Sequence, residues 1–239
     1  IPPSIILVLY GIVTETSIVR LFFAGVVPGL LLALGNALSV IVIGWIIKLP
    51  RGSFDRRRVW PEFKGAAPAL GMPVVILGGL YGGAFTPTEA AAAACGYALV
   101  YGLVSRGRQF LGELLPTAYR SLNLTAVIVF LVGSVGVFQF LLANMYWPQR
   151  IAEAVTNMGL TPLGFIFAYM GILLILGMFV DGVAMVLLTV PVVFPIAMAL
   201  KIDPVHLAII ITLNVETGVV TPPVGLNLFA VSGPSGIPL

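Results

Sequence analysis

Long apolar runs, separated by short polar breaks, dominate the chain. Residues 18–47 and 122–143 form uninterrupted runs, and residues 66–83 and 90–104 form two more on either side of a break at 85–89. A transmembrane α-helix needs roughly 20 mostly apolar residues. The pattern therefore predicts an all-α protein that crosses a membrane several times.

Other apolar runs are too short or too interrupted to be simple spans. Residues 5–13 follow a double proline and predict a half-helix. Residues 163–200 are long but are interrupted at Asp181-Gly182, Pro191 and Pro195, which predicts two segments. Residues 207–213 and the run from Val224 flank a polar break at 214–223, so that residues 207–239 are expected to form a re-entrant hairpin and the half-helix after it.

The composition agrees with a membrane protein and excludes several functions. Hydrophobic residues make up 59% of the chain and charged residues 9%, whereas a soluble domain carries about 25% charged residues. With one cysteine and one histidine the chain has no CxxC, zinc-binding or HExxH motif, and no phosphate-binding loop is present. The net charge of +3 indicates cytoplasmic loops rather than a nucleic-acid partner.

Two basic stretches predict the orientation of the chain. Residues 48–64 hold half of the Lys and Arg residues of the chain, and residues 106–120 carry a smaller excess, so both stretches are expected on the cytoplasmic side. Residues 144–159 have one Arg and one Glu and contain the belt-like Tyr146-Trp147 at the end of the preceding span, so this loop is expected on the periplasmic side.

The break at residues 214–227 is the strongest candidate site. Lipid cannot satisfy free backbone N–H and C=O groups, so a break at membrane depth must be buried in protein or line a watery cavity. Hydroxyl, amide and carbonyl oxygens are ligands that suit Na⁺, and helix ends also offer N–H groups to an anion. The alternative is a plain extramembrane turn. The candidate ion or substrate ligands are Asn214, Thr217, Gly218, Thr221, Pro222, Pro223 and Asn227, and the candidate Na⁺ ligands among them are Thr217, Gly218, Thr221 and Asn227.

The start of the chain repeats this theme. Pro2-Pro3-Ser4 precedes a short apolar run, as Pro222-Pro223-Val224 does. Interrupted hydrophobic segments in corresponding halves point to a transporter's binding site, so Pro2, Pro3 and Ser4 join the candidates.

Two isolated carboxylates have both a functional and a structural interpretation. An ionised Asp181 at the centre of a membrane helix would cost about 2.5–3.5 kcal/mol, which suggests a role in the site; a helix cap facing water is the alternative. Glu89 follows Thr86, Pro87 and Thr88, so it fits a capped helix start whose dipole it complements, and a coupling role is the alternative.

Three motifs resemble the large membrane subunit of tripartite ATP-independent periplasmic (TRAP) transporters. They are the stretch from Gly78 to Ala92 (GGLYGGAFTPTEAAA), the stretch from Gly177 to Asp181 (GMFVD) and the stretch from Thr221 to Phe229 (TPPVGLNLF). The resemblance runs over essentially all 239 residues.

The resemblance implies an elevator-type carrier of the bacterial inner membrane, not an enzyme. Its two inverted repeats each hold a helical hairpin whose tip binds Na⁺ and substrate. Such carriers import small organic anions, such as dicarboxylates or sialic acids, which a periplasmic binding protein delivers, and a small four-helix membrane subunit completes the complex. Residues 1–239 would form part of one transport domain, because the family has more chain before Ile1 and a further helix after Leu239. Gly182 and Glu216-Thr217 depart from the family's usual residues.

Other functions remain open at this point. The runner-up is another sodium- or proton-coupled anion carrier with a similar hairpin plan. A membrane scaffold would not need polar broken helices. An intramembrane enzyme would need Asp181 and Glu216 to reach one substrate.

The orientation can be tested by cysteine labelling in intact cells. If residues 48–64 are cytoplasmic, a cysteine in place of Arg57 is shielded by the membrane and stays unmodified by an impermeant thiol reagent added outside. Reaction from outside would show that the predicted topology is inverted.

Overall fold

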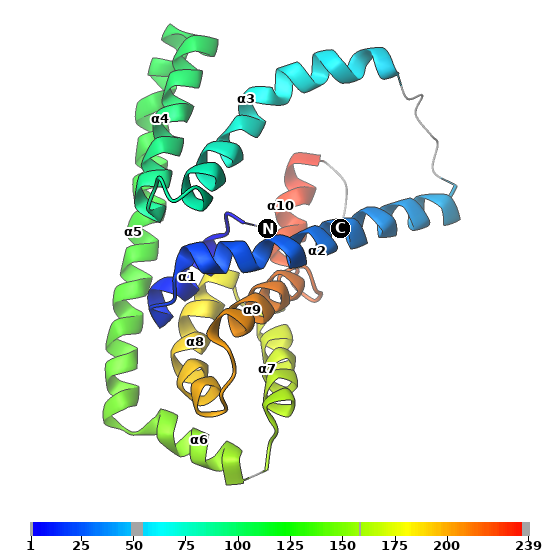
Figure 1. Cartoon of the computed structure of the whole chain (residues 1–239). Coiled ribbons are helices and arrows are strands. Elements are labelled where there is room, and N and C mark those ends of the chain that lie inside the picture. Colours follow the sequence, from blue (N-terminus) through cyan, green and yellow to red (C-terminus); the bar gives the residue numbers. More distant parts are fainter. Residues whose placement is uncertain (1, 49–54, 158, 236–239) are drawn as a thin grey trace. The chain divides into compact units, whose positions relative to one another are not determined.

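All regular secondary structure in the described part of the chain is α-helical. A computed structural model describes residues 2–48, 55–157 and 159–235, and in these residues there are ten α-helices and no strand. This confirms the all-α class. The helices are α1 (Ile5–Thr14), α2 (Ile18–Ile46), α3 (Arg56–Tyr81), α4 (Pro87–Arg106), α5 (Arg108–Asn144), α6 (Trp147–Asn157), α7 (Pro162–Gly177), α8 (Gly182–Ala199), α9 (Pro204–Gly218) and α10 (Leu226–Ser235) (Figure 1).

The helices belong to two compact units. The first unit holds residues 25–122 together with the first residues of the chain, and the second holds residues 4–24 and the chain from residue 123 onward. The boundaries fall inside α2 and α5, so each of these helices contributes to both units.

Several helices begin at the same local signal, a capping residue followed by proline. Thr86, Thr161 and Asp203 each accept a hydrogen bond from a backbone N–H in the first turn of α4, α7 and α9, and a proline follows each of them. The cap satisfies an N–H that has no partner within the helix, and proline has no N–H to leave unpaired. These helix starts are therefore encoded locally.

The first unit contains the hairpin of α3 and α4, which pack side by side (Figure 1). The hydroxyl of Tyr97 on α4 donates to the Pro68 carbonyl on α3 at 2.7 Å. At the turn, the N–H of Phe85 donates to the Gly79 carbonyl at 3.1 Å, and the Phe85 ring occupies the space where a β-carbon on residue 79 would lie. The glycines of the first motif thus shape this turn.

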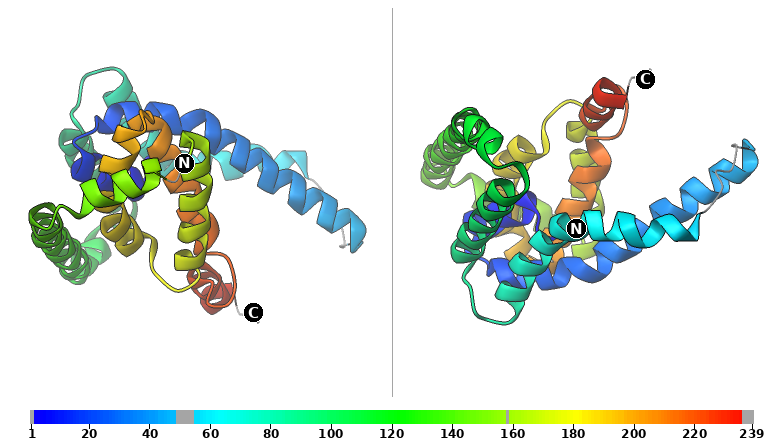
Figure 2. Two further views of the ribbon diagram at one scale, coloured as in Figure 1. Left: turned by 90° about the horizontal axis from the view of Figure 1, so that it is seen from below. Right: turned by 90° about the horizontal axis from the view of Figure 1, so that it is seen from above.

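The core of the second unit is built around α1, α8 and α9, which contact one another (Figure 2). Tyr10 of α1 is fully buried; its hydroxyl donates to the Pro204 carbonyl at the start of α9 at 2.8 Å, and its ring meets the edge of Phe194 on α8. The other buried side chains of this core include Ile6, Leu7, Met185, Val186, Leu187, Val190, Leu207, Ile211 and Val215.

Helices α7 and α9 cross at two glycines. A β-carbon on Gly177 would lie 2.7 Å from the Cα atom of Gly218, which shows how closely the two backbones approach. Four residues before Gly218, the buried Asn214 side chain of α9 donates to the Met170 carbonyl of α7 at 2.9 Å. Lipid provides no hydrophobic drive between helices, so close backbone packing and interhelical hydrogen bonds of this kind hold membrane helices together.

Four of the described helices, α2, α3, α5 and α8, are long and apolar enough to cross a membrane. Their most apolar windows have mean hydropathies of 2.3, 1.4, 2.4 and 2.3. Most of the surface of α2, α3 and α5 is not covered by other parts of the chain, as expected of helices that face lipid or further protein. The predicted crossing at residues 90–104 lies in α4, which is not one of the four, and it stays a prediction.

The breaks inside apolar sequence are confirmed in part. The predicted half-helix at residues 5–13 is α1, and the interruption at Asp181-Gly182 separates α7 from α8. Pro191 and Pro195 do not interrupt α8, although sequence reasoning expected them to. The break predicted to begin at Asn214 begins only after Gly218, because α9 continues through these residues.

Three predicted loops contain helix. The described part of the basic stretch 48–64 is helical from Arg56, because Asp55 caps α3 by accepting from the Arg57 N–H at 2.9 Å; residues 49–54 lie outside the described residues. Residues 106–120 are helical on both sides of Gly107, and residues 144–159 contain α6. Charge alone indicated the side of the membrane, not the local structure.

The crossing of α7 and α9 predicts a difference between two glycines of α7. Gly177→Ala places a β-carbon against the Gly218 backbone, which cannot retreat like a flexible side chain, so we expect a loss of about 1–3 kcal/mol of stability. Gly171→Ala is the matched control, because no atom lies within 4 Å of a β-carbon there, and it should be neutral or stabilising by up to about 1 kcal/mol. Thermal unfolding of the purified full-length variants measures both, and equal melting temperatures would contradict the packing.

Candidate functional site

Four helix ends meet at one end of the second unit. Gly182 begins α8, and a β-carbon there would lie 2.9 Å from Cγ1 of Val215 on α9 and 3.5 Å from Cδ1 of Ile6 on α1. Gly177, the last residue of α7, touches Gly218, the last residue of α9. The starts of α1 and α8 therefore lie beside the ends of α7 and α9.

These helix ends have opposite polarity. The last four carbonyls of α7 and α9 have no partner within their own helix, and the same holds for the first N–H groups of α1 and α8. Helix C-termini carry partial negative charge and attract cations, whereas N-termini attract anions. Ser4 stands at the N-cap position of α1 but its side chain makes no capping hydrogen bond, so it leaves these amides to other partners. One place in the fold thus combines features suited to a cation and to an anion.

Asp181 lies at the break between α7 and α8 and caps α8. Its Oδ2 atom accepts a hydrogen bond from the Val183 N–H at 2.9 Å, and the residue is exposed. Asp181 is therefore a helix cap, which was the structural alternative for this carboxylate in the sequence. The capping bond engages one of the two carboxylate oxygens.

The last turns of α9 hold three of the candidate ligands in helical backbone. Asn214 is buried and uses its amide to bind the Met170 carbonyl, which gives it a part in packing. The hydroxyl of Thr217 donates to the Leu213 carbonyl at 2.8 Å, and Gly218 is engaged in the contact with Gly177. Glu216 is exposed on the same helix.

The true break runs from Val219 to Gly225 and is closed by backbone hydrogen bonds. The Thr221 N–H donates to the Gly218 carbonyl at 2.9 Å, and the Asn227 N–H donates to the Val219 carbonyl at 3.2 Å, so Asn227 returns to the start of the break. Gly225 has a positive φ of 58°, which glycine adopts without strain. Pro222 and Pro223 are exposed and joined by a cis peptide bond. A cis peptide bond also joins Pro2 and Pro3, of which Pro2 is buried and Pro3 is exposed.

The hydroxyl of Thr221 donates to the Thr217 carbonyl at 2.6 Å. A hydroxyl that gives its proton to a carbonyl keeps its oxygen lone pairs, so Thr217 and Thr221 both present oxygen in the form that Na⁺ requires. The residue types and their hydrogen bonds therefore fit a cation. Within the described residues, no group of three or more His, Cys, Asp and Glu side chains is placed to hold a metal ion.

The predicted site residues are divided between the two units. Ser4, Asp181 and the segment from Asn214 to Asn227 share the second unit, whereas Pro2, Pro3, Thr86, Thr88 and Glu89 belong to the first. In that unit Thr86, not Thr88, is the cap of α4: its hydroxyl accepts from the Glu89 N–H at 3.3 Å, and Oε2 of Glu89 accepts from the Thr86 N–H at 2.8 Å. This reciprocal capping box is the structural role that the sequence suggested for Glu89.

Gly177 is the position to which sequence reasoning gave no role. The residue stood inside the second motif, but only Asp181 of that motif was singled out. A glycine at the last position of each of two short apolar helices was the available signal, because it permits a close crossing. The partner of each glycine became evident only in three dimensions.

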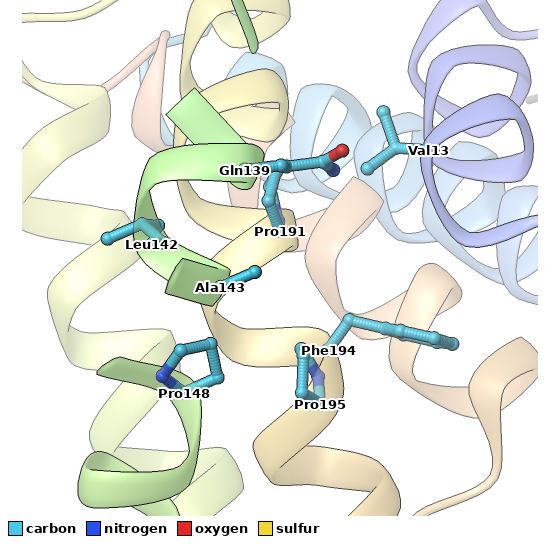
Figure 3. Close-up of a pocket in the computed structure, with 8 residues that line it drawn as sticks. All are labelled: Val13, Gln139, Leu142, Ala143, Pro148, Pro191, Phe194 and Pro195. Atoms are coloured by element: carbon cyan, nitrogen blue, oxygen red, sulfur yellow. The ribbon is translucent and has the colours of Figure 1, made fainter. Parts of the chain in front are cut away.

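A separate cavity of about 240 Å³ lies in the same unit (Figure 3). Pro191 and Pro195 of α8 are ten and more residues beyond Asp181, which at 1.5 Å per residue places them at least about 15 Å along the helix from the break. Gln139 supplies the one polar side chain of the lining, so the cavity is unsuited to an anion. It is lined by Val13, Gln139, Leu142, Ala143, Pro148, Pro191, Phe194 and Pro195.

Comparison with known proteins identifies the class. The family model of the tripartite ATP-independent periplasmic transporter, DctM component, matches residues 1–235. The chain therefore belongs to this family of large TRAP permeases, multi-pass proteins of the bacterial inner membrane and not enzymes.

Individual relatives are similar along the whole chain. The C4-dicarboxylate TRAP transporter large permease protein DctM of Pseudomonas aeruginosa is 43% identical over 240 residues, covering 100% of this chain and 56% of the relative. The sialic acid large permease SiaM of Vibrio cholerae is 38% identical over 243 residues, with the same coverage of 100% and 56%. The ectoine/5-hydroxyectoine large permease UehC of Ruegeria pomeroyi is 38% identical over 238 residues, covering 96% of this chain and 54% of the relative. The chain thus spans little more than half the length of these proteins.

The geometry at Asp181 separates a cap from a functional carboxylate. Asn caps helices as well as Asp does, so Asp181→Asn in the full-length protein should insert normally and keep its melting temperature. We expect it nevertheless to alter uptake, because the negative charge is lost beside the helix ends. Asp181→Ala is the comparison variant and should lose about 1 kcal/mol with the capping bond. Wild-type uptake by Asp181→Asn would reduce Asp181 to a cap.

Proposed function

We propose that this chain forms part of the transport core of a TRAP permease that imports a small organic anion together with Na⁺. The observation that carries the proposal is the meeting of helix C-termini and helix N-termini at one place in an otherwise apolar unit. Membership of the large TRAP permease family supports a transport role for that place. C4-dicarboxylates and sialic acid, which are named for two of the relatives, are organic anions of the proposed class.

In the proposed mechanism the cation and the anion stabilise each other. Thr217, Gly218, Thr221 and Asn227 supply oxygen ligands to Na⁺, and the uncapped N–H groups at the start of α1 face the anion. An anion alone would be costly at membrane depth, and a cation bound beside it offsets its charge. Uptake then depends on the Na⁺ gradient, because the substrate site is complete only when the ion is bound.

Membership of the family supports a proposal for the remainder of the assembly. We propose that the segment from α9 through α10 is a re-entrant hairpin, and that the transport domain moves as a body in an elevator mechanism. The substrate would be delivered by a periplasmic binding protein, and a small four-helix membrane subunit would complete the complex. Thr86, Thr88 and Glu89 would contribute to coupling only through the α3–α4 turn that they fix.

The Na⁺ dependence of uptake tests the proposal. In the complete transporter, Thr221→Ala or Asn227→Ala should raise the Na⁺ concentration for half-maximal uptake, because each variant removes one side-chain oxygen. Uptake into proteoliposomes is measured over a Na⁺ titration, with the binding protein and a C4-dicarboxylate or sialic acid present.

Thr117→Ala is the matched control, since this exposed threonine lies on α5 in the other unit. It should leave the Na⁺ titration unchanged. An unchanged Na⁺ dependence in both site variants would remove the break from the ion site. Wild-type uptake without any Na⁺ gradient would favour proton coupling instead.

A further inference from the structure

The start of α3 is an exposed basic segment with no protein partner among the described residues of its unit. Every residue from 55 to 64 is exposed. Arg56, Arg57 and Arg58 occupy the first turn, and Arg58 is the one of the three with an acidic side chain within ion-pair distance, Asp55 at 3.8 Å. The segment therefore presents guanidinium groups that other described side chains do not neutralise.

The same segment has an apolar side. At 3.6 residues per turn, Val59, Trp60 and Phe63 fall within an arc of about 100°. Trp60 and Phe63 stack with ring centroids 6.0 Å apart, and both remain more than half exposed, at 63% and 52%. Lys64 lies over the Trp60 ring at 5.4 Å from the centroid. Exposed stacked aromatics beside cations are typical of a helix that rests in the headgroup region of a membrane.

We propose that residues 55–64 of α3 bind the headgroups of anionic phospholipids at the membrane surface. The occupant follows from charge complementarity: the arginines can bind phosphate with two parallel hydrogen bonds, while Trp60 and Phe63 enter the boundary of the acyl chains. Arginine also lies at the N-terminal end of the helix, where the dipole adds attraction for an anion. The apolar remainder of α3 then continues from this anchor.

The helical structure of residues 55–64 fixes the spacing of the basic and aromatic side chains, which an irregular loop would not do. The helix begins at Arg56, so its basic and aromatic side chains are held at fixed spacing, and the Asp55 cap fixes where the helix starts. Each basic residue near an anionic surface contributes about a fivefold gain in binding. The three arginines together should therefore give a clear preference for anionic over zwitterionic lipid.

Native mass spectrometry of the purified, delipidated full-length permease tests this. Phosphatidylglycerol and phosphatidylcholine with identical acyl chains are titrated separately. The wild type should bind phosphatidylglycerol in preference, and Arg56→Gln, Arg57→Gln and Arg58→Gln combined should lower that affinity at least tenfold while phosphatidylcholine binding stays the same. The corresponding triple lysine variant keeps the charge and should keep most of the preference.

The control variant also loses three positive charges, but at positions outside residues 55–64. Arg106→Gln, Arg108→Gln and Arg120→Gln combined remove three arginines around the α4–α5 junction, where Arg106 is already paired with Glu113 at 3.1 Å. This variant should retain the preference for phosphatidylglycerol. Unchanged phosphatidylglycerol binding in the α3 variant, or an equal loss in the control, would overturn the proposal. Neither result depends on Na⁺ coupling or uptake.

Discussion

Hydrocarbon offers no hydrogen-bond partner to a free amide or carbonyl, so wherever a helix stops inside this chain the protein itself must satisfy the backbone. The chain meets this constraint in two ways. Thr86, Thr161, Asp181 and Asp203 cap helix starts with their own side chains. At the break after α9, backbone hydrogen bonds from Thr221 and Asn227 close the gap instead. The meeting of the ends of α1, α7, α8 and α9 is the place that we propose for the ion and the anion.

Small residues make that meeting possible. Gly177, Gly182 and Gly218 allow backbones or bulky neighbours to approach to distances that a β-carbon would prevent. In a membrane such contacts replace hydrophobic burial as the source of helix association. The same residues therefore serve stability and position the site, and a substitution there is expected to affect both. Asn214 is a further residue of this kind: the sequence placed it among the candidate ligands, and in the structure its amide binds the Met170 carbonyl of α7.

Two kinds of exposed surface suit two different layers of a membrane. Its apolar helices present bare hydrophobic faces, whereas the start of α3 presents arginine together with stacked aromatic rings. The first suits the hydrocarbon interior and the second suits the headgroup layer. We therefore propose a membrane anchor at the start of α3 and a part of the transport core in the second unit.

The sequence by itself determined the class and most of the helices, but not α6 or the starts of α3 and α5, which lie in stretches that were predicted as loops. Long apolar runs, the interruption at Asp181-Gly182 and the Thr-Pro or Asp-Pro starts depend on residues within a few positions of each other, so they can be read locally. The sequence predicted that Pro191 and Pro195 would interrupt a helix and that the break would begin at Asn214 rather than after Gly218. Both predictions were wrong, because neighbouring helices decide whether a polar or proline-containing turn stays helical.

Only the tertiary structure decided that Gly177 meets Gly218, that Asn214 binds Met170, and that Ser4 and Asp181 share one end of the unit. These contacts join residues about 40 to 180 positions apart, and no local pattern encodes which distant helix will be the partner.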